Sequence, residues 1–454
     1  MKFCLTLAAT VLLGAISLEA HAQQPWLADR RYGEGIGIRV GNLELHPGIS
    51  GEVGYDSNYF LRAPADVPPP HAAYRLRVTP SISLATLGLQ RREANGAPAT
   101  QSLTFRGSAY VAYNELIAAD SKNSSEFSDQ RHVDIGTDLA LNIAPQARVG
   151  ADTYVNFVRM VQPSNDPNTE NAFNRDSLRA GVGATWRPGG GLFDWRLGYE
   201  FLYNFFEKSV YANSLNNYQN TVNMRGRWRF LPRTAVLYDG SYTWVTYANN
   251  ATQNDGAIVR SRIGMNGLIT TRLSLLGMIG WAGTFYNARA GNTQQFDSVT
   301  AQAELKWFIS GGQEVMNAGS APMGLSYASI GYTRDVSNSY LGNFYQRDRG
   351  YAGISYLLGG VFVTSLTGGV ANLRFPASPA ANNQAFSEQR VDATLFGEYR
   401  LSNTFGLNAT VNYDQNITNK SLQARDPMTG VGVGPQDHLE FSRWQVFLGA
   451  RYFL

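Results

Sequence analysis

The sequence predicts an all-β fold, a transmembrane antiparallel outer-membrane β-barrel of about eighteen strands. Apolar and polar residues alternate from His46 to Leu454, in segments of roughly 12 to 18 residues separated by turn-rich stretches. The connections between these segments alternate between short and long, as they do in bacterial outer-membrane barrels. Charged residues make up 16% of the 454-residue chain and aromatic residues 12%, a balance that excludes a disordered chain.

Composition and charge exclude two further classes of protein. The mean hydropathy is −0.24, and beyond about the first 18 residues no apolar run approaches the roughly 20 residues that a membrane helix needs. The net charge is +3 and no run of Lys or Arg occurs, so we expect no nucleic-acid partner.

The first residues predict where the chain is sent. Lys2, the apolar stretch 5–18 and the small residues around Ala20 to Ala22 form the three regions of a Sec signal peptide. We therefore expect a signal peptide at 1–22, a Gly-rich periplasmic N-terminal lead-in at 23–44 and the barrel at 45–454. The predicted location is the outer membrane of a Gram-negative cell, reached by Sec-dependent export. Because the single cysteine, Cys4, falls in the signal peptide, we expect no disulfide, thiol chemistry or Cys-bound zinc.

The alternation has a period of two, which places each set of residues on one face of a strand. Val222, Met224 and Trp228 share one parity, whereas Arg225 and Arg227 share the other. Eighteen such segments are expected to begin at about residues 46, 71, 100, 127, 147, 173, 192, 217, 233, 257, 272, 294, 323, 344, 361, 386, 403 and 437.

Loop lengths distinguish a membrane barrel from a soluble β-sandwich. Connections after even-numbered strands are short, except near 89–99 and 310–322, and those after odd-numbered strands are longer and polar. This pattern predicts periplasmic turns at one end and extracellular loops at the other. A soluble sandwich would have shorter strands and a polar face rich in Lys and Glu, whereas Lys is scarce in this chain.

The last segment adds an independent indication. The spacing of Gly449, Tyr452 and Leu454 is similar to the C-terminal signal that the outer-membrane assembly machinery reads, although Phe447 stands where a polar residue is usual. Aromatic residues also recur near the ends of the apolar parities, where lipid interfaces favour amphipathic rings. They are Tyr74, Tyr113, Trp186, Trp195, Tyr203, Trp228, Trp244, Trp281, Trp307 and Trp444.

The residues of the mature chain favour no catalytic site. Only His46, His71, His132 and His438 follow the signal peptide, and no G-x-S-x-G motif occurs. His132 shares a parity with two aspartates, but no nucleophile accompanies them. We therefore predict no enzymatic activity, no cofactor and no metal ion.

The inward face carries the remaining chemistry, with more basic than acidic residues. The pore-lining candidates are Arg225, Arg227, Arg229, Arg260, Arg262, Arg347, Arg349, Arg390 and Arg400. The first five should form one positive patch on the wall, with Asp239 as its clearest acid. Two interpretations remain open: a ladder of salt bridges that satisfies a wide lumen, and an anion-favouring conduit.

The start of the barrel resembles the opening of the β-barrel porin-2 family. A G-x-R-x-G segment leads into a first strand that ends Gly-Tyr-Asp-x-Asn-x-Phe, and 79–88 is similar to the second strand of that family. The matching residues are Arg39, Gly41, His46, Pro47, Tyr55, Asp56, Asn58 and Phe60. Members of the family look like outer-membrane partners of polysaccharide-export systems.

The resemblance implies a conduit for export of a hydrophilic, acidic polysaccharide, such as an exopolysaccharide, a capsule or a spore coat. The expected partners are outer-membrane lipid, the assembly machinery, the polysaccharide itself and a periplasmic or outer-membrane polysaccharide export protein. The alternative is a general or anion-preferring diffusion porin, and a more remote one is a barrel enzyme that modifies lipid.

Overall fold

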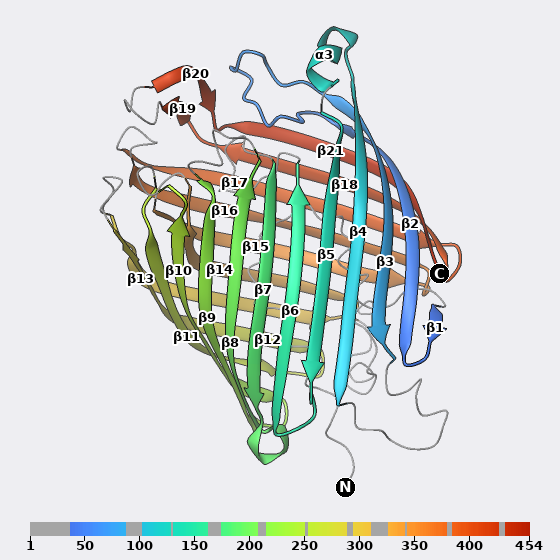
Figure 1. Cartoon of the computed structure of the whole chain (residues 1–454), viewed down its shortest axis with the longest axis vertical. Helices are drawn as coiled ribbons and strands as arrows, with labels where there is room; N and C mark the ends of the chain where they lie inside the picture. The colour runs from blue at the N-terminus through green and yellow to red at the C-terminus, as the bar shows by residue number, and fades with distance from the viewer. Residues whose placement is uncertain are drawn as a thin grey trace.

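The computed structural model describes residues 37–87, 102–128, 130–161, 174–207, 215–249, 253–287, 294–309, 326–340, 343–378, 384–425 and 432–454. Within these ranges nineteen strands form one antiparallel sheet, and the strands β2 to β18 and β21 close into a ring of eighteen (Figure 1). The short strand β1 (Ile38–Val40) pairs only with the start of β2. A two-stranded ribbon, β19 (Ser421–Arg425) with β20 (Gly432–His438), lies outside the ring.

The ring strands, in chain order, are β2 (Leu43–Asp56), β3 (Ala73–Thr86), β4 (Leu103–Ala118), β5 (His132–Ile143), β6 (Val149–Met160), β7 (Arg175–Trp186), β8 (Phe193–Phe206), β9 (Asn217–Leu231), β10 (Thr234–Tyr247), β11 (Gly256–Leu268), β12 (Leu273–Tyr286), β13 (Asp297–Phe308), β14 (Tyr327–Asn338), β15 (Phe344–Leu358), β16 (Phe362–Ser378), β17 (Gln384–Arg400), β18 (Phe405–Ile417) and β21 (Phe441–Phe453). The predicted fold class is confirmed. The largest difference between a predicted and an observed strand start is five residues, at β5, which the sequence predicts from 127 and which begins at His132.

The first and last strands of the ring close the barrel. β21 pairs with β18 on one side and with β2 on the other, from Gly48 opposite Phe453 to Asp56 opposite Gln445. The backbone N–H of Leu454 also donates to the carbonyl of Pro47 at 3.1 Å. Closure leaves no free edge strand in the ring, as lipid requires.

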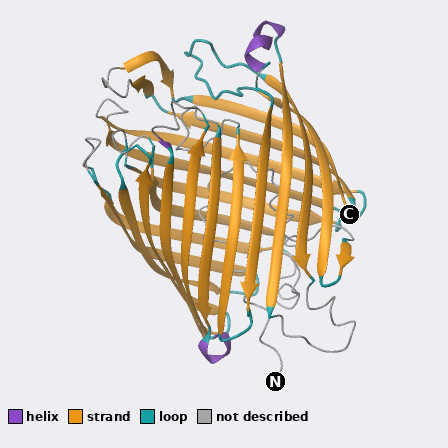
Figure 2. Ribbon diagram, viewed as in Figure 1, coloured by secondary structure: helices purple, strands orange, loops and turns teal. Residues whose placement is uncertain are grey.

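The two ends of the barrel differ as predicted. Turns 232–233, 269–272, 359–361 and 401–404 are short, and Gly359 and Gly360 adopt positive φ angles of 57° and 75° that a two-residue reversal demands. The opposite end carries the longer connections, including the short helix α3 (Ser124–Phe127), whereas the 3₁₀ turn η3 (Pro188–Gly191) lies at the short-turn end (Figure 2). We refer to these as the long-loop end and the short-turn end.

The apolar parity faces outward. Trp228, Leu448 and Ile263 are 54%, 59% and 56% exposed, as expected for side chains that face lipid in the membrane. The ten predicted girdle aromatics lie on ring strands, eight of them within three residues of a strand end, whereas Tyr113 and Trp281 lie five residues from one. In the described part of the chain, no helix has both the length and the apolar character to cross a membrane.

The predicted signal peptide at 1–22 lies outside the described residues. Most of the predicted lead-in at 23–44 also does, but residues 38–40 already form β1, and the first ring strand begins at Leu43 rather than near 46.

Removing residues 452–454 should prevent assembly, because it deletes the predicted assembly signal together with the last pairs of β21 with β2 and β18. We expect the heat-modifiable folded band to vanish from outer-membrane fractions. Replacing the same three residues with alanine is the control, since it keeps the backbone pairs and removes only the signal. A normal folded yield after the deletion would show that residues 452–454 carry neither the assembly signal nor backbone pairs that the barrel needs to close.

Candidate functional site

Ion pairs cover the inward parity of the ring. They join neighbouring strands, strands that are two or three apart and, on β17, residues of a single strand. The carboxylate–guanidinium pairs include Glu52–Arg77, Asp152–Arg196, Asp194–Arg227, Asp239–Arg262, Asp335–Arg260, Glu388–Arg390, Asp392–Arg349 and Glu398–Arg400. A charged side chain at membrane depth must face water or a partner, and these residues do so on the inside of the barrel.

Among the described residues, at least four carboxylates are each shared by two guanidiniums. They are Asp56 with Arg75 and Arg443, Asp194 with Arg187 and Arg227, Asp239 with Arg225 and Arg262, and Glu398 with Arg400 and Arg451. In the triad of Asp239, Arg262 Nη2 lies 2.6 Å and Arg225 Nε 3.7 Å from the carboxylate. Two guanidiniums on one carboxylate leave one net positive charge, and the triads of Asp194 and Asp239 place two such charges on the wall β7 to β11.

The structure brings three of the predicted arginine-patch residues together. Arg225 lies opposite Asp239 and Asp239 lies opposite Arg262 on three successive strands, and Arg227 follows on the same face of β9. Arg260, expected in this patch, instead pairs with Asp335 of β14 at 2.8 Å. Arg229 lies on the same parity of β9 as Arg227.

The other predicted pore residues lie farther round the ring. Arg349 of β15 pairs with Asp392 of β17 at 2.6 Å, and Arg347 lies two residues earlier on the same parity of β15. Arg390 and Arg400 pair with Glu388 and Glu398 of their own strand at 3.0 Å. These residues therefore form separate pairs and are not part of the patch on β9 to β11.

Two glycines allow arginines to reach across an intervening strand. Arg196 of β8 donates to both carboxylate oxygens of Asp152 on β6, and a Cβ at Gly183 of β7 would lie 2.4 Å from its guanidinium. In the same way, a Cβ at Gly369 of β16 would lie 2.7 Å from Arg349 on its way to Asp392. A side chain at either position would block the crossing, so the glycines are part of the ion-pair geometry.

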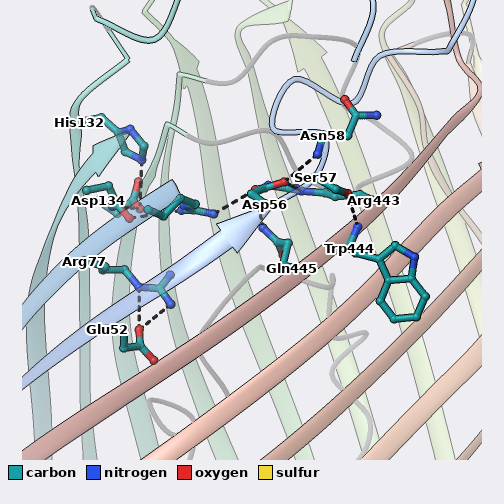
Figure 3. Close-up of polar contacts among 12 residues, drawn as sticks. Glu52, Asp56, Ser57, Asn58, Arg77, His132, Asp134, Arg443, Trp444 and Gln445 are labelled. Atoms are coloured by element: carbon teal, nitrogen blue, oxygen red, sulfur yellow. Dashed lines mark hydrogen bonds and ion pairs between the residues drawn. The ribbon is translucent and has the colours of Figure 1, made fainter. Parts of the chain in front are cut away.

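A buried polar network spans β5 to β21 across the closing seam (Figure 3). Asp56 is fully buried; it accepts from Arg443 Nε at 2.9 Å and from Gln445 at 2.9 Å, and it faces Arg75 at 3.6 Å. The network continues through Asn114, which accepts from Arg75 at 3.3 Å and donates to Asp134 at 3.0 Å. The seam is therefore held by charged side chains as well as by backbone pairs.

The segment from Arg39 to Phe60, which resembles the porin-2 family, contacts the end of the chain at both ends of the seam between β2 and β21. His46 Nδ1 donates to the carbonyl of Leu454 at 3.1 Å, and Asn58 donates to the carbonyl of Ser442 at 3.1 Å. Together with Asp56 they hold β2 against β21.

Phe447, the aromatic residue at a usually polar position of the predicted assembly signal, packs inside the seam between β2 and β21. Its ring is 4% exposed, points inward over Gly54, and lies 5.4 Å and 5.0 Å from the guanidinium carbons of Arg75 and Arg77. Both distances fall within the range of cation–π contacts. The aromatic residue therefore spreads over two buried arginines that a polar side chain of ordinary size would leave uncovered.

Two loops at the long-loop end fold onto the inner wall of β3 and β4. Tyr59 and Phe127 pack with the inward-facing Ala73 and Leu116 in one apolar cluster. Glu126 of α3 binds Arg62 at 2.5 Å and also accepts from His71. Burial raises the pKa of the Glu126 carboxyl, but the hydrogen bonds and charges of these two partners outweigh burial, so its pKa lies below the ordinary value.

The described ranges hold no group of three or more His, Cys, Asp or Glu side chains that could bind a metal ion. His132 Nε2 lies 3.7 Å from Asp134, but no third donor of this kind joins them in the described part of the chain. The residues missed by sequence reasoning include Arg187, Asp335, Glu388 and Arg451. Asp335 has the inward parity of its strand, and this parity alone would have placed it among the candidate pore-lining residues.

No protein-family model matches the chain, and no curated protein matches it. The chain is similar to solved outer-membrane structures at low identity. Pseudomonas aeruginosa OccK5 (OpdH) has 8% identity and a TM-score of 0.44, with 90% of this chain and 98% of that chain covered. Pseudomonas aeruginosa OccK7 (OpdD) has 9% identity and a TM-score of 0.45 over 91% and 99%. An anion-selective porin from Comamonas acidovorans has 13% identity and a TM-score of 0.37 over 91% and 99%. Likenesses this distant assign no function, and membership of the β-barrel porin-2 family stays a prediction.

Proposed function

We propose that the chain forms an outer-membrane conduit whose inner wall favours anionic, hydrophilic solutes. The observation that carries this proposal is the pair of triads on β7 to β11, in which Asp194 and Asp239 are each shared by two arginines. The surplus positive charge lies on the inner face of a closed barrel, where a low-dielectric wall strengthens its field.

The state of Arg225 supports this proposal. Among the described residues, its one ion pair is the 3.7 Å contact with Asp239 and its Nε has no hydrogen-bond partner, and its side chain is 32% exposed. A guanidinium fork that is half satisfied can bind a carboxylate or another oxyanion in bidentate fashion. Arg225 is therefore the group on this wall that is best placed to bind a passing anion.

The solute that we propose is an acidic polysaccharide on its way out of the cell. Two features support this: the porin-2-like segment from Arg39 to Phe60, and the suitability of arginine forks for uronic-acid carboxylates. A polysaccharide export protein at the short-turn end would deliver the polymer. The second candidate is an anion-preferring diffusion porin, which the same positive wall would serve.

Planar-bilayer recordings test the conduit. In a KCl gradient we expect a reversal potential that shows anion preference, and this preference should weaken from 0.1 M to 1 M salt because the Debye length falls from about 10 Å to about 3 Å. Oligogalacturonate should change the current through the conduit, whereas the neutral oligosaccharide of equal length should leave it unchanged. Cation preference at low salt would contradict the proposal.

A gene deletion separates the two candidate solutes. If the conduit serves export, the deletion strain should lose surface polysaccharide while the polymer accumulates in the periplasm. If surface polysaccharide is unchanged and uptake of small anions falls, the diffusion porin is the correct function.

A further inference from the structure

The hairpin of β14 and β15 leaves the wall of the barrel at the long-loop end. β13 pairs with β14 only as far as Ala301 opposite Arg334, although β14 continues to Asn338. On the other side, the first pair of β15 with β16 is Gln346 with Arg374, although β15 begins at Phe344. The end of the hairpin therefore pairs only with itself, for example Asn338 with Phe344.

Side chains of distant strands hold this end inside the barrel. Arg260 of β11 binds Asp335 at 2.8 Å and donates to the carbonyl of Val336 at 2.8 Å. The amide of Asn338 accepts from Tyr286 of β12 at 3.0 Å and donates to the hydroxyl of Tyr247 on β10 at 2.7 Å. At about 4.8 Å per strand, β10 and β14 are roughly 19 Å apart along the wall, so this contact requires the hairpin to cross the interior.

The tip reaches still farther, to β8 and β9. Tyr340 is 7% exposed; its hydroxyl accepts from Asn217 of β9 at 3.1 Å, and its ring meets Phe206 of β8 edge-on at 5.6 Å. Its carbonyl accepts from Gln253 at 3.0 Å, and Asn254 donates to Asn343 at 2.9 Å. Loop side chains from 253–254 thus tie both sides of the tip.

Three buried apolar clusters hold the hairpin against the inner wall. Tyr340 belongs to a buried cluster with residues of β8 and β10, and Val336 and Phe344 belong to another with residues of β11 and β12. Tyr345 packs in a third cluster on the inward face of β16 and β17. Because burying such side chains is favourable, the hairpin rests across the mouth and does not swing freely.

We propose that the described end of this hairpin, residues 335–340 and 343–346, is the barrier that keeps the conduit shut at rest. The contacts of Tyr340 with β8 and β9 hold this barrier in the closed position. The inference rests on the proposed conduit and adds its regulation. Among the contacts described above, the ties of the tip are neutral hydroxyl and amide bonds, apart from those of Arg260 to Asp335 and to the carbonyl of Val336. A hydrophilic polymer entering from the short-turn end can replace such bonds with its own hydroxyls, so an engaged polymer holds the barrier open, whereas with small ions alone it opens only rarely.

Single-channel recordings of Tyr340→Ala test this proposal. The substitution removes the ring from its cluster and the acceptor of the Asn217 bond, so we expect the open fraction to rise by at least about tenfold, equivalent to about 1.4 kcal/mol. Cells that carry the variant should also become sensitive to large hydrophilic antibiotics. Tyr332→Ala is the matched control: Tyr332 lies on the same strand but faces outward and is 41% exposed.

A cross-link tests the same barrier without weakening the fold. Asn254→Cys with Asn343→Cys, joined by a short bis-maleimide, should hold the tip shut even with Tyr340→Ala present. Tyr340→Ala channels that gate like the wild type, or cross-linked channels that still open, would overturn the barrier. Absence of current in the wild type and every variant would overturn the conduit as well, which separates the two failures.

Discussion

Replacing Asp56 with asparagine should strongly lower the unfolding temperature of the barrel. Asp56 is fully buried and binds Arg443 and Gln445 across the seam between the first and last ring strands. Without the carboxylate, Arg443 and Arg75 remain as buried charges that have lost their shared partner. Breaking a buried ion pair in this way costs about 3 to 5 kcal/mol. Heat-modifiability on gels and loss of β-signal in circular dichroism would measure the shift.

A double-mutant cycle identifies the source of this cost. Asp56→Asn with Arg443→Gln should unfold at a higher temperature than Asp56→Asn alone, because the second change removes one of the unpaired guanidiniums. Asp120→Asn is the control, since Asp120 caps the 3₁₀ turn η2 (Ser121–Asn123) on an exposed loop. If Asp56→Asn unfolds like this control, the seam is held by its backbone pairs alone.

The seam shows what the sequence could reveal about this barrel and what it could not. The parity of β2 and β21 predicts that Asp56 and Arg443 point inward, because lipid tolerates only the apolar parity. Their pairing could not be predicted, since the two residues are 387 positions apart and each faces several inward charges of the opposite sign. Phe447 is visible in the sequence as an aromatic residue at a polar position, but only the structure shows the two arginines that it covers.

The strands were predictable for a physical reason that does not extend to the hairpin end. A strand that spans lipid must keep one apolar face along its whole length, so the period of two persists through every ring strand. Where β14 and β15 leave the wall, both faces contact protein, and Val336 and Tyr340 are buried inside the barrel. Apolar residues at this end of a strand look the same in sequence whether they meet lipid or fold inward.

Changing Arg225, Arg227, Arg229, Arg260 and Arg262 together to glutamine should reverse the ion preference of the conduit. The sequence indicates Asp239 as the clearest acid among them, and the structure adds Asp194 beside Arg227 and Asp335 beside Arg260. The five guanidiniums therefore outnumber three carboxylates in the wild type, and the variant keeps the carboxylates. With a Debye length of about 8 Å at physiological salt, the wall should change from positive to negative toward a passing ion. Reversal potentials in a KCl gradient would show the permeability ratio crossing from anion to cation preference.

The carboxylates of Asp194, Asp239 and Asp335 determine which control variants the experiment needs. They lose their arginine partners in the quintuple variant, so adding Asp194→Asn, Asp239→Asn and Asp335→Asn should restore thermal stability and leave a wall with little preference for either ion. Arg233→Gln with Arg272→Gln removes charge from exposed turns at the short-turn end and should leave selectivity almost unchanged. Equal permeability ratios in the wild type and the quintuple variant, at both low and high salt, would mean that the arginines serve only to pair with the inner acids. The anion-favouring conduit would then have to be abandoned for an unselective barrel, because the quintuple variant breaks both triads, of Asp194 and of Asp239, that carry the proposal.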